Sequence, residues 1–363
     1  MKYKLQDIVD VTMGQSPKSE FYNNDGEGVP FLQGNRTFGF KYPTFDTFTT
    51  MVTKEAKAGD VIMSVRAPVG DLNITPVDIC LGRGVCSLRM KNGNQEFLYY
   101  MMKYYIPQLI NKESGTVFGS VNRNDIIELE IDIPNDAEKQ GKISRFLSML
   151  DEKIQINNKI NNNLEQQVSA LYQSWFEDFD PTNGVCPDNW SNQMLSTIAD
   201  ISSGKRPPIK SEVYSQETPI SIVGAASVMG FTSEANHTDK ILVTGRVGTH
   251  GVIQRFNTPC WTSDNTLVIT SPFYEFANQI LHRIDYSSMN RGSTQPLITQ
   301  GDMKKVVVLV PDEETLAKFE ALAGSLMAQW EANNNENVKL ASLRDTLLPK
   351  LMSGELEVSD LDL

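Results

Sequence analysis

The chain repeats itself, and this repetition restricts its fold more than any other feature of the sequence. Residues 5–17 resemble residues 195–207, with five identities at a constant offset of 190 positions. A second match, at a constant offset of 177, pairs Gly115, Asp125 and Pro134 with Gly292, Asp302 and Pro311. Internal repeats mark duplicated structural units. The sequence therefore predicts two related domains whose middle parts have diverged in length.

Short apolar runs, punctuated by glycine and proline, fill both domains. The runs 61–65 and 240–244 are each followed by a glycine-containing turn. Such runs predict β-strands joined by tight turns. Longer stretches, over 97–109 and 274–284, predict intervening helices. We therefore expect an α+β fold with two tandem α/β domains.

Each domain is followed by a long helical pattern. In residues 143–175 and 316–351, apolar residues recur at spacings of three and four, which is typical of a helix with one buried face. Pro349 and Gly354 are expected to end the second helix. Midway along both helices the apolar seam turns to asparagine, at Asn157, Asn161, Asn333 and Asn337. The seam predicts that the two helices form a coiled coil.

Asparagines near both helix midpoints favour an antiparallel pairing, in which asparagine faces asparagine. These residues cost stability but fix the register, because a slipped pairing buries an amide against leucine. The helix pair would then separate the domains and act as a ruler. The alternative is an asparagine-rich helix centre without such a role. The predicted limits are 1–135 and 186–311 for the two α/β domains, 136–185 for the central helix and linker, and 312–363 for the second helix and tail.

The net charge of −12 counts at first against a nucleic-acid-binding protein. Most of the acidic excess lies in the helical segments, with −3 in residues 136–185 and −7 in residues 312–363. Residues 1–135 and 186–311 are nearly neutral, at −2 and 0, so each can still gather basic groups on one face. The four scattered cysteines favour neither a zinc site nor a disulfide scaffold, and they suit a reducing cytoplasm. No apolar stretch predicts a membrane span.

Two segments at the helix ends carry a resemblance to a known family. They are LEQQVSALYQSWFEDFDP, at 164–181, and LRDTLLPKLMSGEL, at 343–356. Both resemble the central and distal conserved regions of type I restriction–modification specificity subunits. The duplicated openings, with Gly14 and Pro17 or Gly204 and Pro207, are similar to the starts of that family's target recognition domains. The resemblance covers the whole chain.

The resemblance implies a DNA-binding scaffold and not an enzyme. In that family each target recognition domain reads one half of a split double-stranded DNA target, and the two helices dock two methyltransferase subunits. The complex methylates adenine with S-adenosylmethionine, and two restriction (motor-nuclease) subunits cleave unmethylated DNA with ATP and Mg²⁺. No catalytic residue, cofactor or metal is therefore expected on this chain. Its place would be in the cytoplasm, in association with the nucleoid.

Polar and basic side chains in glycine-rich loops are the candidates for DNA contact. Arginine and lysine form paired hydrogen bonds with guanine, and asparagine and glutamine with adenine, while cations also position the phosphates. The candidates in the first domain are Lys18, Gln33, Asn35, Arg36, Lys41, Arg66, Arg83 and Arg123. The candidates in the second domain are Lys205, Arg206, Lys210, Arg246, His250, Arg255, Arg291 and Gln295.

Patterns of catalytic sites are short or incomplete in this sequence. Asp46, Glu55 and Lys57 form the D…ExK pattern of metal-dependent nucleases, but residues 55–57 are expected to form an exposed turn. The segment 204–206 lacks the remaining residues of a phosphate-binding loop. Two alternatives stay open. One is a structural coiled-coil adaptor whose domains bind protein, and the other is a stand-alone nuclease or methylase with an unrecognised site.

Overall fold

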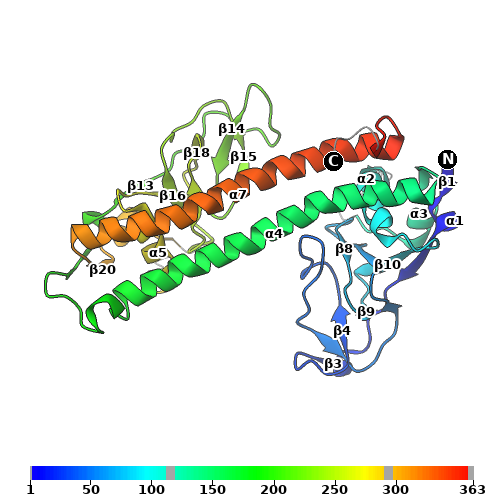
Figure 1. The fold of residues 1–363 in the computed structure, drawn as a ribbon, viewed down its shortest axis with the longest axis horizontal. Helices are drawn as coiled ribbons and strands as arrows, with labels where there is room; N and C mark the ends of the chain where they lie inside the picture. The colour runs from blue at the N-terminus through cyan, green and yellow to red at the C-terminus, as the bar shows by residue number, and fades with distance from the viewer. Residues whose placement is uncertain (1, 112–118, 290–296, 359–363) are drawn as a thin grey trace. The chain divides into compact units, whose positions relative to one another are not determined.

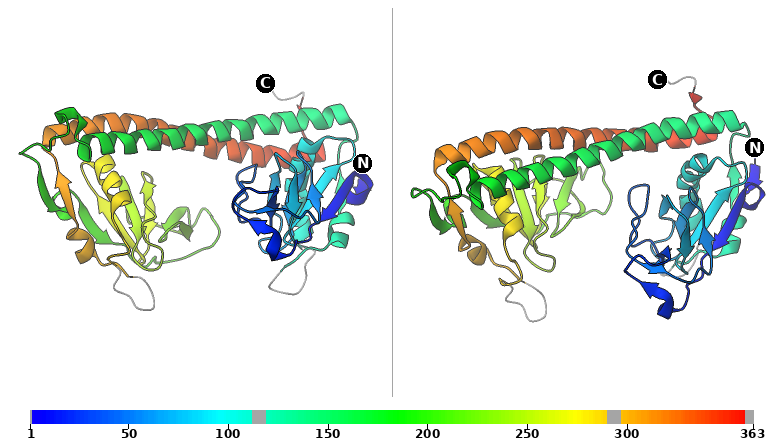
Figure 2. Two further views of the ribbon diagram at one scale, coloured as in Figure 1. Left: turned by 90° about the horizontal axis from the view of Figure 1, so that it is seen from below. Right: turned by 60° about the horizontal axis from the view of Figure 1, so that its bottom comes forward.

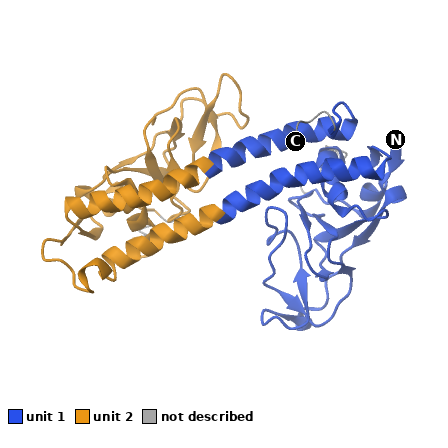
Figure 3. Ribbon diagram, in the orientation of Figure 1, with its two compact units in different colours: residues 1–159, 333–363 blue, residues 160–332 orange. Residues whose placement is uncertain are grey.

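A computed structural model describes residues 2–111, 119–289 and 297–358 of the chain (Figure 1). The chain divides into two compact units, distinguished in Figure 3. Unit 1 consists of Met1–Lys159 and Asn333–Leu363, and unit 2 consists of Ile160–Ala332. Each unit contains an α/β domain and one part of each of two long helices, α4 (Ala137–Phe176) and α7 (Glu313–Ser353). The predicted fold class, two tandem α/β domains with two long helices, is confirmed.

The described part of unit 1 contains three sheets, in which β4 and β9 are parallel and the other neighbours are antiparallel. The first sheet pairs β1 (Lys2–Lys4) with β11 (Glu130–Asp132). The second has the order β2 (Val9–Met13), β10 (Val85–Met90), β7 (Val61–Ser64) and β8 (Leu72–Ile74). The third has the order β3 (Tyr22–Asn23), β5 (Phe48–Thr49), β4 (Val29–Leu32), β9 (Ile79–Leu81) and β6 (Glu55–Ala56). The shorter helices are α1 (Leu5–Ile8), α2 (Gln95–Asn111) and α3 (Arg123–Ile127).

Unit 2 repeats this arrangement in its described residues. β12 (Ser191–Met194) pairs with β20 (Val307–Val310), as β1 pairs with β11. The four-stranded sheet has the order β13 (Asp200–Ser203), β19 (Thr266–Thr270), β16 (Ile241–Gly245) and β17 (Gln254–Phe256). The remaining sheet has the order β15 (Val228–Thr232), β14 (Ile220–Val223) and β18 (Cys260–Thr262), with β14 and β18 parallel as β4 and β9 are. The shorter helices are α5 (Tyr274–Arg283) and α6 (Gln300–Lys304).

Matched capping boxes explain part of the sequence repeat. Helix α3 begins after Asn122, whose side chain accepts a hydrogen bond from the backbone of Asp125, and Asp125 bonds back to the cap. Helix α6 begins in the same way with Thr299 and Asp302. A capping box satisfies backbone N–H groups that the first helical turn leaves unpaired. The match of Asp125 with Asp302 therefore marks the same structural position in both units.

The two long helices are antiparallel within each unit. In unit 1, Asn157 on α4 donates to Glu336 and Asn337 on α7 at 2.7 and 2.9 Å. In unit 2, the indole of Trp330 on α7 donates to Glu165 on α4 at 2.8 Å. The strands of each unit lie on one side of its helix segments (Figure 2). The predicted antiparallel coiled coil is confirmed, and the role of its asparagines in setting the register stays a prediction.

The sequence predicted that Pro349 helps to end helix α7, and this prediction is wrong. The helix continues to Ser353 and is followed by Gly354, which has a φ of +75°. Proline removes only one backbone N–H, and its cost is outweighed here because Leu348, Leu351 and Met352 are buried in the core of unit 1. Only Gly354 stands at the predicted end, where its left-handed backbone conformation suits a helix terminus.

A buried ion pair joins α2, α4 and α7 in unit 1. Asp151 on α4 is completely buried and accepts hydrogen bonds from Arg344 on α7, at 2.6 Å, and from the hydroxyl of Tyr100 on α2, at 2.8 Å. Removal of one partner leaves a buried charge unpaired. Arg344 interrupts the apolar seam of α7 because it forms this ion pair. The hydrogen bonds to Asp151 connect α2 of the domain with both long helices.

Replacement of this arginine tests the role of the ion pair. We expect Arg344→Ala to lower the free energy of unfolding by about 3–5 kcal/mol, because Asp151 would lose its cation while it stays buried. The measurement is a urea titration followed by far-ultraviolet circular dichroism. Arg145→Ala, which removes an exposed arginine from α4, serves as the matched control. Equal stability of the two variants would contradict the assignment.

Candidate nucleic-acid interface

Four loops of unit 1 are bound together by their backbones at one edge of the sheets. We call residues 14–18, 33–37, 65–66 and 82–84 the loop cluster of unit 1. The backbone N–H of Gly14 donates to Val85, and that of Gly82 donates to Leu32, at 3.0 and 2.8 Å. The N–H groups of Gly84 and Val65 donate to Gln33 and Gly84, at 3.0 and 2.9 Å. Because backbone atoms make these bonds, the shape of the cluster does not depend on the side chains at its surface.

Two glycines are required by close approach within this cluster. A β-carbon at Gly14 would lie 2.1 Å from the carbonyl oxygen of Gly82. A β-carbon at Gly82 would lie 2.6 Å from the Cα atom of Gln33. Both distances are far inside van der Waals contact with backbone, which cannot move aside as a flexible side chain can. The Gly14 position of the sequence repeat therefore has a packing reason.

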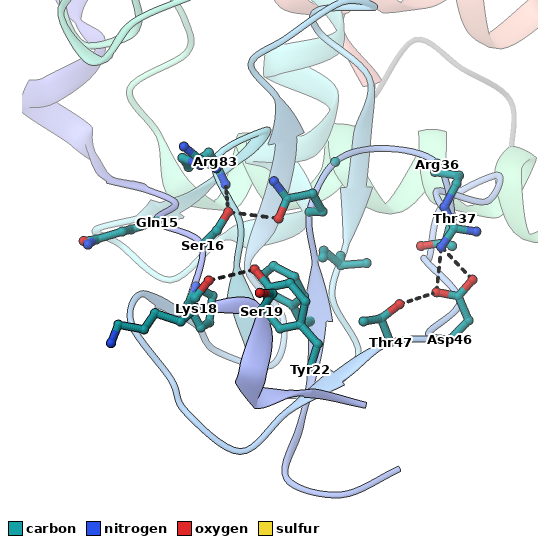
Figure 4. Close-up of a pocket in the computed structure, with 15 residues that line it drawn as sticks. Gln15, Ser16, Lys18, Ser19, Tyr22, Arg36, Thr37, Asp46, Thr47 and Arg83 are labelled. Carbon is teal, nitrogen blue, oxygen red and sulfur yellow. Dashed lines mark hydrogen bonds and ion pairs between the residues drawn. The ribbon is translucent and has the colours of Figure 1, made fainter. Parts of the chain in front are cut away.

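The loop cluster of unit 1 borders a cavity of about 740 Å³ (Figure 4). Four of the predicted DNA-contact residues line it: Lys18, Gln33, Arg36 and Arg83. Ser16 lies between two of them, since its hydroxyl accepts a hydrogen bond from the backbone N–H of Arg83 at 3.2 Å and donates to Oε1 of Gln33 at 2.9 Å. The cavity thus brings together basic and amide groups from three separate loops.

The cations around the cavity differ in how far they are neutralised. Arg36 pairs with Asp46 at 2.8 Å, and this hydrogen bond holds the pKa of the Asp46 carboxyl below its ordinary value. Lys18 is 80% exposed and lies 3.8 Å from Glu20. The side chain of Arg83 is exposed and forms no ion pair with the described residues. Arg83 therefore offers its full charge and all its donors to a bound molecule.

Unit 2 builds an equivalent loop cluster from residues 204–207, 224–225, 246–247 and 263–265. The N–H of Gly204 donates to Thr266, and that of Ser263 donates to Val223, at 3.1 and 3.0 Å. The N–H of Arg246 donates to Asn265 at 2.7 Å. These three bonds correspond to three of the four named in unit 1, and a β-carbon at Gly204 would lie 2.1 Å from the carbonyl oxygen of Ser263. The backbone framework is therefore duplicated.

The side chains on the two frameworks differ. The bonded pairs place Arg206 at the position of Ser16, Gly224 at that of Gln33, and Asp264 at that of Arg83. An amide and a cation at the surface of unit 1 are thus replaced by a glycine and an anion in unit 2. Two copies of one framework present different chemistry at equivalent points.

The other first-domain candidates lie in several settings. Arg66 and Arg123 are exposed, and Asn35 donates to Asp71. Lys41 does not face solvent. It is 2% exposed, and its ammonium group lies 3.0 Å from both Glu96 and Ser148. A lysine that is buried beside a carboxylate cannot reach a phosphate in solvent, so Lys41 does not belong to the interface.

The second-domain candidates are similarly divided. Lys205, Arg206 and Lys210 are exposed, while Arg246 and His250 are half-buried. Arg255 is 11% exposed and forms a two-point pair with Glu275, with both distances 2.7 Å, so it too is left out. Arg291 and Gln295 lie outside the described residues.

The sequence pattern of a metal nuclease does not form a site. The sequence predicted a turn at residues 55–57, and this prediction is wrong for Glu55. Glu55 begins strand β6, which pairs with β9. Lys57 pairs with Glu55 and Asp78, whereas Asp46 pairs with Arg36. In the described part of the chain, no group of three or more histidine, cysteine, aspartate and glutamate side chains is placed to hold a metal ion. Nor does any described helix combine the length and apolar character of a membrane span.

Three residues of the two clusters escaped the sequence analysis. Ser16 orients a neighbour instead of offering charge, and its only signal is its place inside the repeated opening. Asp264 and Asn265 are exposed immediately before β19, but an acidic residue does not stand out as a DNA-contact candidate. Asp264 and Asn265 are the counterparts of residues 83–84, and only the repeated backbone hydrogen bonds of the folded chain show this equivalence.

Comparison with known proteins shows which family the chain resembles. The family model of the type I restriction modification DNA specificity domain matches residues 1–166. The type I restriction enzyme MjaIX specificity subunit of Methanocaldococcus jannaschii is 24% identical, in an alignment that covers 99% of this chain and 94% of that protein. By both comparisons the chain is similar to type I restriction–modification specificity subunits.

Two further proteins extend the comparison. The putative MjaX specificity subunit of the same organism is 37% identical over 163 residues, which are 44% of this chain but only 38% of that relative's length. The crystal structure of the S subunit from M. genitalium has a TM-score of 0.60 at 19% identity, with 97% of this chain and 96% of that chain covered. The chain therefore has the same fold as that S subunit along almost its whole length.

The loop cluster of unit 1 makes a direct prediction about two neighbouring glycines. Gly82→Ala should lower the free energy of unfolding by about 1–3 kcal/mol, because the added methyl group collides with backbone. Gly34→Ala should change it by less than about 0.5 kcal/mol, because a β-carbon there meets no atom within 4 Å. Urea titration of both variants measures the difference. A stable Gly82→Ala protein would show that the cluster is looser than described.

Proposed function

We propose that this chain is a type I specificity subunit that reads a bipartite double-stranded DNA target, with one half-site for each α/β domain. The observation that carries the proposal is the duplicated loop cluster, in which one backbone framework presents different polar side chains in units 1 and 2. A split target needs two readers of similar shape and different chemistry, because each half-site has its own bases. The proposed readers are residues 1–135 and 186–311.

The chemistry of the loop clusters suits DNA. Exposed cations such as Lys18, Lys205 and Arg206 would position the phosphates, which supply most of the affinity but no sequence information. Side chains that reach base edges, such as Gln33 and Arg83, would supply the specificity. Most of the acidic excess of the chain lies in the helical segments and not in the two α/β domains.

The helices α4 and α7 would scaffold the other subunits of the complex. We propose that they dock two methyltransferase subunits and two restriction subunits, which would bring S-adenosylmethionine, ATP and Mg²⁺. The chain itself would supply no catalytic group. Its site of action would be the cytoplasm, beside the nucleoid.

Domain exchange with methylation mapping tests this function. The chain would be co-expressed with its methyltransferase subunit, and N6-methyladenine would be mapped across the genome. We expect a split motif in which replacement of residues 1–135 by those of a relative changes one half-site, and replacement of 186–311 changes the other. Each exchange should leave unchanged the half-site that is read by the domain that was not exchanged.

Two results would contradict the proposal in different ways. A stable complex without methylation would favour a structural coiled-coil adaptor. Methylation or cleavage by the purified chain alone would show an active site on this subunit.

A further inference from the structure

The side chain of Gln33 is held in one orientation. The backbone N–H of Arg83 can only donate, so the hydroxyl oxygen of Ser16 must accept there, at 3.2 Å. The hydroxyl proton of Ser16 is then available to Oε1 of Gln33, which lies 2.9 Å away (Figure 4). Hydrogen bonds from Gly82 and Gly84 also hold the backbone on both sides of Gln33. This glutamine is therefore positioned before any ligand arrives.

This orientation leaves Gln33 with donors to offer. Its Oε1 atom accepts from Ser16 through one of its two lone pairs, while Nε2 forms no hydrogen bond with the described residues, and the residue is exposed. Arg83, which lines the same cavity, has only N–H donors. The amide nitrogen of Gln33 and the guanidinium group of Arg83 therefore both offer hydrogen-bond donors at this cavity.

A site that offers only donors can distinguish the bases by the groups on their major-groove edges. Adenine offers one acceptor and one donor, cytosine offers a donor, and guanine offers two acceptors, N7 and O6. A glutamine pairs with adenine through both ends of its amide, whereas the hydrogen bond from Ser16 holds Oε1 of Gln33 toward Ser16 and leaves Nε2 as the end of the amide without a partner among the described residues. We infer that Gln33, oriented by Ser16, acts with Arg83 to select guanine at one position of the half-site read by unit 1. This inference rests on the proposed function.

Unit 2 lacks this arrangement at the equivalent points. Gly224 replaces Gln33, and Asp264, whose carboxylate only accepts hydrogen bonds, replaces Arg83. The guanine selection is therefore a property of unit 1 alone. Variants of this site should alter one half-site and leave the other as it is.

The test uses the complex of the full chain with its methyltransferase subunit and duplexes that carry guanine or adenine at each guanine of the mapped half-site. We expect the native complex to prefer guanine at one position by on the order of 10- to 100-fold in Kd. Ser16→Ala frees the Gln33 amide to present a donor and an acceptor together, so the preference should fall to about threefold or less. Gln33→Glu replaces the donors with a carboxylate and should weaken binding to the guanine duplex by about tenfold or more.

Ser191→Ala is the matched control, because it also removes a serine bonded to a glutamine, Gln193, but in β12 of unit 2 and outside both loop clusters. It should leave the guanine preference unchanged. A half-site for unit 1 that contains no guanine, or an unchanged preference in both Ser16→Ala and Gln33→Glu, would overturn the inference and leave the bipartite reading intact. Loss of the split motif in the native complex would instead overturn the proposed function.

Discussion

The first α/β domain has no complete core without the end of the chain. Leu348, Leu351 and Met352 of α7 are buried in the same cluster as Leu5 and Leu147. The core of the second domain likewise takes Val168 and Phe176 from α4 and Phe319 from α7. Each long helix therefore contributes to both cores, and burial of its apolar face stabilises each domain where the domain meets the helices. The architecture depends on this sharing, because neither helix belongs to one domain alone.

Within each domain, different groups of atoms stabilise the loop cluster and form its surface. The loop clusters are fixed by backbone hydrogen bonds and by glycines whose β-carbons have no space. The side chains at the cluster surfaces contribute little to this framework, so they are free to differ between units 1 and 2. Glutamine, serine and arginine on one framework correspond to glycine, arginine and aspartate on the other. A duplicated fold can thus carry two independent sets of base contacts.

Much of the fold could be predicted from the sequence, because repeats, apolar periodicity and turn residues are local signals. The offset of 177 led to Asp125 and Asp302, which prove to be capping residues. The sequence could not show that Lys41 and Arg255 turn inward to carboxylates, because their partners Glu96 and Glu275 are 55 and 20 residues away. Ser16 was invisible for a similar reason: its role depends on Gln33 and Arg83, which only the folded backbone brings to it.

A tethered cleavage experiment tests the central claim, that the two loop clusters face the two halves of one target. Cys186 is the exposed cysteine, and Cys80, Cys86 and Cys260 are buried, so Cys186→Ser removes the accessible thiol. In that background, Gly34→Cys or Asn265→Cys would carry an iron chelate that cuts nearby DNA. The account predicts cuts confined to one half-site from position 34 and to the other half-site from position 265. Cuts at the same half-site from both positions, or cuts without a preferred position, would contradict it.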